Sequence, residues 1–221
     1  MNPRTFGFII LAFIILLEGF GNAFAQSLDI SSGGAPTITG SVGGSVTGSS
    51  NVLNDLIVTI NFGEVSPSNT NGIVKVVVPI AIRSNQQYKV QALVTGGSNV
   101  NAQALQRTDV GLGFNNFHAM GSNSRVCVNP HIFYAPFSND PSSNVSINAS
   151  GRATYPSTLN NATVATTILS GPRLSNGASS RATNDGYIFD AIFALTPQFF
   201  ANGTTSATIT FTISAGPTSS C

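Results

Sequence analysis

The chain has 221 residues and a formal net charge of +1, and charged residues make up only 8% of it, against about 25% in a typical soluble protein. So few basic residues exclude a nucleic-acid-binding function, because that affinity depends on many Lys and Arg contacts to phosphates. The polar content is instead Ser, Thr, Asn and Gly. This mix suits extracellular fibre and wall-associated proteins, and so weakly charged a surface tolerates self-association.

The first 25 residues predict a signal peptide. Arg4 supplies a positive charge, an apolar run follows over Phe6–Leu17, and Ala23-Phe24-Ala25 forms a small-x-small cleavage site. These features in this order are typical of export signals. The apolar run is shorter than the roughly 20 residues that a spanning helix needs, although an uncleaved membrane anchor is the alternative. We therefore expect a secreted protein that begins at Gln26 and has no membrane segment after the signal is removed.

Residues 26–50 form a Gly- and Ser-rich segment that could serve as a flexible linker. Five of its residues nevertheless alternate with Thr, Ser and Gly in the period of two that predicts a strand; they are Ile38, Gly40, Val42, Gly44 and Val46. The glycines make this strand too weak to fold alone. We expect it to be a donor strand, which pairs with an open sheet edge of another molecule.

Strand patterns continue to the C-terminus and predict one β-sandwich domain over residues 51–221. The clearest strand patterns run over 52–62, 73–82, 88–94, 187–195 and 208–213, and weaker ones over 126–128, 132–134, 144–149 and 164–169. The polar break 83–87 predicts a hairpin, and Pro79 indicates an edge or a bulge. Residues 95–124 predict loops with one short strand. The absence of any helical period favours an all-β sandwich or barrel.

Three segments of the chain resemble the spore coat U and Csu-type group of secreted fimbrial subunits. They are Val58-Thr59-Ile60-Asn61-Phe62-Gly63-Glu64-Val65, Ser84-Asn85-Gln86-Gln87-Tyr88-Lys89-Val90 and, after Pro197–Gly203, Thr208-Ile209-Thr210-Phe211-Thr212-Ile213. They are similar to that group's LxFGxV strand, N-x-x-Y-x-L strand and final strand. The resemblance implies an incomplete immunoglobulin-like β-sandwich that polymerises by donor-strand exchange, with an assembly chaperone as a further partner.

The chain also departs from the pattern of that group. It has no cysteine near the first matching strand, it continues past the last strand over Ala215–Cys221, and residues 95–157 have no counterpart. Its two cysteines are Cys127 and Cys221, and an even count in an exported chain favours one disulfide between them. Two free thiols, or an intermolecular bond through Cys221, are the alternatives.

The sequence predicts neither a metal site nor a catalytic site. His118 and His131 flank Cys127, but this spacing matches no common zinc pattern. The carboxylates are scattered, and no G-x-S-x-G elbow or phosphate-binding loop is present. We therefore expect a protein that is not an enzyme and takes no cofactor. Four sequons mark candidate N-glycosylation sites at Asn144, Asn148, Asn161 and Asn202.

Together these observations favour a structural subunit of an extracellular or cell-surface filament, pilus or coat. Its partners would be copies of itself, joined head to tail into an open homopolymer. The alternative is a secreted adhesin or carbohydrate-binding β-sandwich module. For that alternative, five aromatic residues would form a binding surface: Phe114, Phe117, Phe133, Tyr134 and Phe137.

Overall fold

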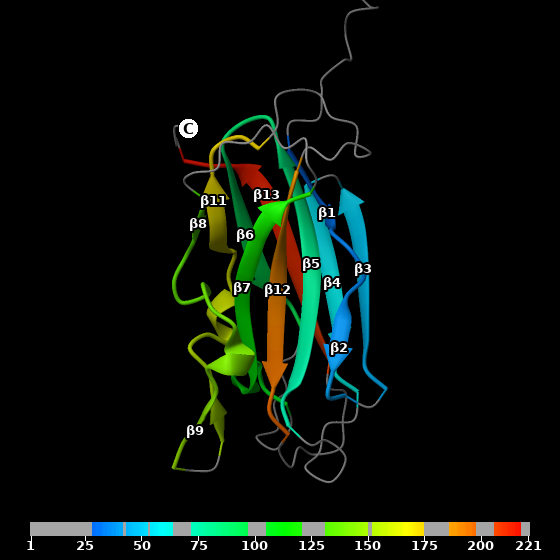
Figure 1. Cartoon of the computed structure of the whole chain (residues 1–221), viewed down its shortest axis with the longest axis vertical. Helices are drawn as coiled ribbons and strands as arrows, with labels where there is room; N and C mark the ends of the chain where they lie inside the picture. The colour runs from blue at the N-terminus through cyan, green and yellow to red at the C-terminus, as the bar shows by residue number, and fades with distance from the viewer. Residues whose placement is uncertain are drawn as a thin grey trace, which may run out of the picture.

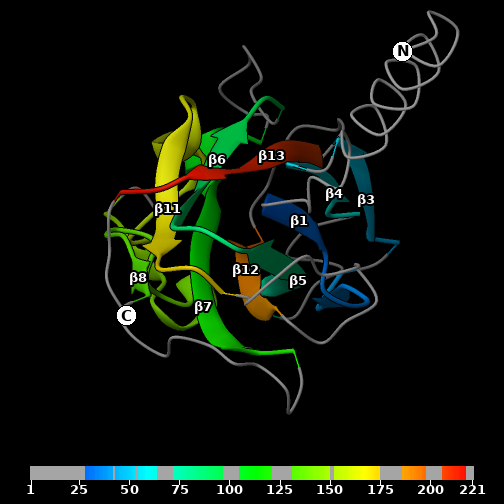
Figure 2. The same ribbon diagram turned by 90° about the horizontal axis from the view of Figure 1, so that it is seen from above.

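A computed structural model describes residues 28–41, 43–52, 54–63, 72–96, 105–120, 131–149, 152–174, 186–197 and 206–217. These residues form two antiparallel β-sheets that pack face to face, and their helical turns are all short 3₁₀ turns. Figure 1 shows the two layers along their strands, and Figure 2 shows the same layers from above. The prediction of an all-β sandwich is confirmed.

The layer that faces the viewer in Figure 1, here called the front sheet, is built around β5 and β12. Its strands in spatial order are β1 (Leu28–Ser32) and β2 (Thr37–Thr39), which pair end to end with one side of β5, then β5 (Val74–Ser84), β12 (Tyr187–Leu195) and β7 (Val110–Ala119). The front sheet therefore ends at β1 and β2 on one side and at β7 on the other.

The second layer, here called the back sheet, has six strands. In spatial order they are β3 (Ser45–Val52), β4 (Asp55–Asn61), β13 (Ser206–Ala215), β6 (Tyr88–Val94), β11 (Thr166–Gly171) and β8 (Ile132–Phe133). The remaining elements are the small hairpin of β9 (Ser146–Ile147) and β10 (Ala153–Thr154), and the 3₁₀ turns η1 (Arg107–Asp109), η2 (Pro141–Ser143) and η3 (Leu159–Ala162).

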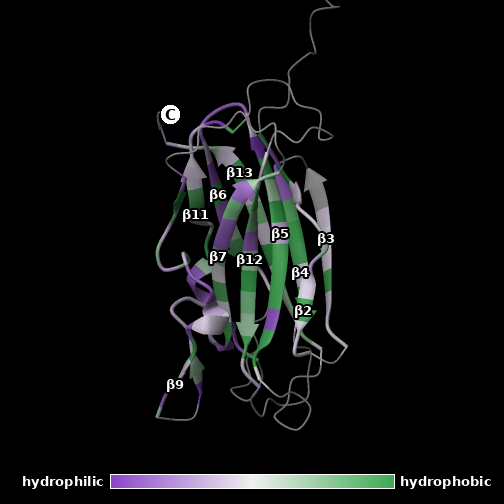
Figure 3. Cartoon of the chain, in the orientation of Figure 1, coloured by the Kyte–Doolittle hydropathy of each residue, from purple (hydrophilic) through white to green (hydrophobic). Residues whose placement is uncertain are grey.

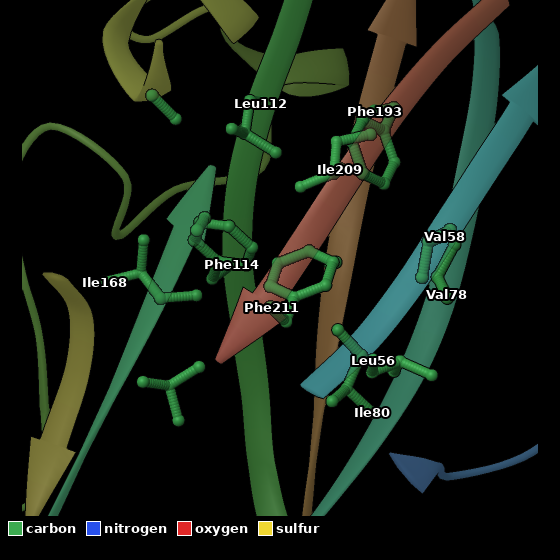
Figure 4. Close-up of a cluster of buried hydrophobic side chains, with 14 of the residues drawn as sticks. Leu56, Val58, Val78, Ile80, Leu112, Phe114, Ile168, Phe193, Ile209 and Phe211 are labelled. Carbon is green, nitrogen blue, oxygen red and sulfur yellow. The ribbon is translucent and has the colours of Figure 1, made fainter. Parts of the chain in front are cut away.

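The core lies between the two sheets and consists of the alternate residues that each strand directs inward. On β4 these are Leu56, Val58 and Ile60, each at most 2% exposed. Figure 4 shows Phe114 of β7 and Phe211 of β13 facing each other across the core, with ring centroids 6.0 Å apart in an edge-to-face arrangement. Burying one such side chain contributes about 1.5–3 kcal/mol.

The predicted hairpin between residues 73–82 and 88–94 is wrong. β5 belongs to the front sheet, whereas β6 pairs with β13 and β11 in the back sheet, so residues 85–87 cross from one layer to the other. The Oγ atom of Ser84 accepts a hydrogen bond from the backbone N–H of Gln86 (3.2 Å) at this corner. Both strands bury one whole face, and two such strands can face each other across a core as readily as they can pair side by side.

β7 is also much longer than the short strand predicted within residues 95–124, since it runs over ten residues. Its sequence is poor in β-branched residues, which hides it from a propensity argument. A register shift against β12 marks a bulge, and Asn116 adopts a φ of 56° there. The Nδ2 atom of Asn116 donates a hydrogen bond to Oδ2 of Asp190 (2.7 Å), which ties the bulge to β12.

Pro79 lies on the inner strand β5, at the point where the pairing with β1 and β2 is interrupted, and β5 itself has no bulge against β12 there. β1 pairs with β5 as far as Ile80, and β2 resumes the pairing at Val77. Between them the Pro79 carbonyl accepts a hydrogen bond from the Gly33 N–H (2.8 Å). Because proline has no N–H to offer this neighbour, the edge strand loses nothing by breaking at this point.

Residues 131–149 and 152–162, here together called the clasp, fold over the outer strand β7. The Phe114 N–H donates to the Phe137 carbonyl (2.8 Å), and the Leu112 N–H donates to the Ser157 carbonyl (3.0 Å). Between these two points the clasp lies on the outer face of the sheet, where Gly111 and Gly113 provide the space. The clasp therefore satisfies backbone groups of β7 that the edge of a sheet would otherwise leave unpaired.

Two ion pairs hold the clasp in place. Nζ of Lys75 on β5 lies 2.6 Å from Oδ2 of Asp140, and Nη2 of Arg152 lies 2.7 Å from Oδ1 of the buried Asp109. Partial burial acts to raise the pKa of Asp140, but hydrogen bonds from Lys75 and Ser142 outweigh it, so the pKa lies below its usual value. Asp140 therefore stabilises the folded state as a carboxylate.

Gly113→Ala should destabilise the protein by about 1–3 kcal/mol, the usual cost of overpacking. A Cβ atom at this position would collide with the carbonyl oxygen of Asn139 and come within 2.8 Å of Pro141 Cδ. Urea unfolding followed by circular dichroism measures the loss. The matched control is Gly48→Ala, whose Cβ would meet only Leu56 Cδ1 at 4.0 Å. Equal stability of the two variants would refute the close packing of the clasp.

Acid should weaken the attachment of the clasp through Asp140. Because its pKa is lowered in the folded state, its contribution is complete above the unfolded-state pKa of about 3.9 and is lost as the pH falls through the folded-state value. We expect Lys75→Met to make the fall in stability below about pH 4 less steep. Urea midpoints between neutral and acidic pH test this, with Lys89→Met on β6 of the back sheet as the charge-matched control.

Candidate functional site

β1 and β2 together form the N-terminal arm, defined as residues 28–39, which is the outermost strand of the front sheet. Leu28 and Ile30 of the arm are buried, and Ile38 is half-buried against the core. β1 packs on β4 and β13 of the opposite sheet. The arm therefore completes one side of the sandwich in its own chain by adding a strand to β5 and apolar side chains to the core.

A buried ion pair fixes the position of the arm on β5. Asp29 and Arg83 are directly opposite each other in the register of β1 and β5. The Nη1 atom of Arg83 lies 3.0 Å from Oδ2 of Asp29, and the two side chains are only 8% and 5% exposed. A shift of the arm by one residue would turn Asp29 to the other face of the sheet and separate two buried charges. The pair thus selects one register.

The residues predicted to form one donor strand lie on two different strands. Ile38 is on β2 and pairs with Val76 of the front sheet, whereas Val46 is on β3 and pairs with Ile60 of the back sheet. Gly40 and Gly44 belong to the connection between them, and Val42 lies outside the described residues. The arm and β3 are therefore separate edges, one in each sheet, on the same side of the sandwich (Figure 1).

The connection between the arm and β3 depends on glycine. Gly40 has a φ of +80° and Gly43 a φ of +74°, in the left-handed region that L side chains rarely adopt. A Cβ atom at Gly40 would also lie 2.8 Å from the carbonyl oxygen of Ile73. These glycines let the chain turn from one sheet to the other within a few residues.

The other predicted site residues are scattered over the molecule. Cys127, Cys221 and the sequon residue Asn202 lie outside the described residues. Asn144, Asn148 and Asn161 are exposed, and all three belong to the clasp. The Oδ1 atom of Asn161 accepts a hydrogen bond from the Thr158 N–H (2.8 Å).

The two histidines have different surroundings. His118 is exposed on β7, and its Nδ1 atom lies 2.7 Å from the Asn116 carbonyl oxygen. His131 is half-buried, with its Nδ1 atom 2.9 Å from the hydroxyl of Tyr88. Burial, with a smaller effect of Tyr187, raises the pKa of Tyr88 well above its usual value. Across the described ranges, no three His, Cys, Asp or Glu side chains are grouped as metal ligands would be.

The aromatic residues proposed for a binding surface mostly pack inside the sandwich. Phe114 and Phe137 belong to the core, at 0% and 1% exposed. Phe117 and Phe133 are half-buried with their rings edge to face, 6.2 Å apart. Tyr134 is exposed, and its hydroxyl is hydrogen-bonded to Ser170. The sequence predicts loops with one short strand around Phe114 and Phe117, because the pattern of β7 is weak, and a weak strand around Phe133. In the fold Phe117 of the front sheet packs on Phe133 of the back sheet.

Asp29→Leu should destabilise the protein by about 3–5 kcal/mol, because it leaves Arg83 buried without its carboxylate. Replacing both partners, as Asp29→Leu with Arg83→Leu, should recover most of this loss, since neither charge of this pair is then buried without the other. Urea unfolding of the two single variants, the double variant and the wild type measures the coupling. A single variant as stable as the wild type would contradict the structural importance of the pair.

No protein-family model, curated protein or solved structure matches the chain. In the part of the chain that the structure describes, no helix has the length and apolar character needed to cross a membrane. The resemblance to secreted fimbrial subunits therefore rests on the sequence motifs quoted above, and the function has to be inferred from the arm and the sheet edges.

Proposed function

We propose that the protein is a structural subunit of an extracellular filament, pilus or coat, with an immunoglobulin-like sandwich that joins its neighbours by exchanging the N-terminal arm. One observation carries this proposal. The arm is an edge strand that supplies core residues such as Ile30, yet only a short glycine-containing connection joins it to β3.

Exchange of the arm costs little in contacts. An arm that leaves its own β5 and pairs with β5 of a neighbour makes the same ladder, the same Asp29–Arg83 pair and the same core contacts of Leu28 and Ile30. Such exchange of identical elements is a low-cost route to association, and head-to-tail contacts of this kind give open fibres.

The chemistry of the arm suits this role. A donated strand gains affinity from backbone hydrogen bonds and specificity from the side chains that enter the core. In the proposal Ile30 and Ile38 fill the core of the neighbour, while Asp29 selects the register through Arg83. An assembly chaperone would be the partner that covers the β5 edge before exchange. The predicted export signal and the low charge of the chain fit an extracellular polymer.

The test locks the arm in place with a disulfide between Ser31→Cys and Ala81→Cys. These residues are opposite each other on β1 and β5, and opposed Cα atoms in such a ladder are about 4.5–5.5 Å apart, which a disulfide can span. We expect the protein from Gln26 onward to form filaments in electron micrographs when the bond is reduced, and none when it is oxidised before assembly.

Ser31→Cys alone is the matched control, because it keeps the native Cys127 and Cys221 but cannot lock the arm. Oxidation after assembly should instead link successive subunits into a ladder on a non-reducing gel. Filaments that grow from the locked monomer, or a wild-type protein that forms no filaments even with its assembly factors, would overturn the proposal.

A further inference from the structure

β3 is one of the two outer strands of the back sheet, and the other, β8, has only two residues. β3 pairs with β4 on one side, and no strand among the described residues pairs with its other side. The clasp covers part of β7, and the arm occupies the edge of β5. Like the outer side of the arm, β3 is therefore a sheet edge without a strand partner among the described residues, and its backbone groups are available to another chain.

The register identifies the groups that face outward. The Ile213 N–H donates to the Asn54 carbonyl (2.9 Å), and hydrogen-bonded pairs alternate along an antiparallel ladder. The odd-numbered residues of β4 therefore turn their backbone groups toward β3, where their partners are Ser45, Thr47 and Ser49. This leaves the N–H and C=O groups of Val46 and Gly48 on the outer edge.

The usual protection against edge-to-edge pairing is missing over this stretch. Natural edge strands carry Lys, Pro, inward charges or bulges, whereas β3 has neither a charged residue nor a proline. Its bulge lies after Ser49, which leaves residues 45–49 in regular register with β4. Figure 3 shows β3 mostly pale, in contrast to the strongly apolar β5.

We propose that β3 pairs antiparallel with β3 of a second copy of this chain, around a two-fold axis beside Thr47. The back sheets of the two copies then form one continuous sheet. In this register Val46 of each copy lies opposite Gly48 of the other, so that the outward N–H and C=O groups of both residues are satisfied. Thr47 lies opposite Thr47 of the second copy.

Self-complementarity argues for a second copy as the occupant of this edge. A two-fold axis places each residue opposite a residue of the same strand, and a strand without charges creates no like-charge contact. Thr47, Thr59 and Thr208 also lie in one row across β3, β4 and β13, with the hydroxyls of Thr59 and Thr208 3.2 Å apart. The two-fold axis extends this row, and cross-strand threonine pairs are favourable.

This lateral contact is separate from arm exchange, because the arm pairs with β5 in the other sheet. In a filament joined by arm exchange, β3 edges would link neighbouring filaments side by side. In a monomer with a locked arm, they would give a closed dimer. The two contacts can therefore be tested independently in the same protein.

The experiment measures the association of the locked-arm variant, Ser31→Cys with Ala81→Cys, by analytical ultracentrifugation. We expect a concentration-dependent dimer. Adding Gly48→Pro removes an outward N–H from each copy and inserts a ring at the edge, so we expect the dissociation constant to rise roughly tenfold or more. Adding Gly48→Ala, which keeps the N–H, should leave the dimer intact. A locked-arm protein that stays monomeric, or a proline variant that dimerises equally well, would overturn the proposal.

A cross-link checks the geometry. Thr47→Cys should form an intermolecular disulfide on oxidation, because opposed non-hydrogen-bonded residues have Cα atoms about 4.5 Å apart. Thr59→Cys on β4 should not form one. Three strand spacings, from β4 to β3, between the two β3 strands and on to the second β4, place it roughly 14 Å from its counterpart. Equal cross-linking of the two variants would contradict pairing at Thr47. Filaments that persist with Gly48→Pro but lose their lateral association would separate this inference from the proposed function.

Discussion

The backbone N–H and C=O groups at the edges of the two sheets need partners, and this need organises the whole molecule. An open sandwich has edge strands on both sides, and each edge is a template for a further strand. The clasp meets part of this need at β7, where the Phe137 and Ser157 carbonyls accept hydrogen bonds. The arm meets it at β5. The edges therefore differ in which segment of the chain supplies their hydrogen-bond partners.

The arm and the clasp differ in how firmly they are attached to the edges that they cover. The clasp is held by the Lys75–Asp140 and Arg152–Asp109 ion pairs. It also packs closely on β7, where Gly111 and Gly113 have no side chains that would collide with it. The arm is the first described segment of the chain, and it joins β3 through the connection at Gly40 and Gly43. In the proposal, where export removes residues 1–25, the arm is attached at one end only and can be exchanged between molecules, whereas the clasp is attached at both ends.

The scarce charges of the chain are used to specify structure. Asp29, Asp109 and Asp140 each form an ion pair between segments that are distant in sequence, and Asp190 is bonded to the bulge at Asn116. The pair of Asp29 and Arg83 is buried, and a buried pair of this kind adds little net stability but penalises wrong arrangements. With so few charges left for the surface, neutral edges such as β3 meet little electrostatic resistance to association.

The sequence by itself determined the strands with a clear period of two, because a half-buried strand must alternate. β12 has the predicted bounds of 187–195, and β4 lies within the strand predicted over 52–62, where it buries every second residue. Only the tertiary structure decided which strands are neighbours: β5 and β6 lie in opposite sheets, and Ile38 and Val46 are on separate edges. The alternation states which face of a strand is buried but carries no information about its partner. The partner is set by contacts such as Asp29 with Arg83, between residues far apart along the chain.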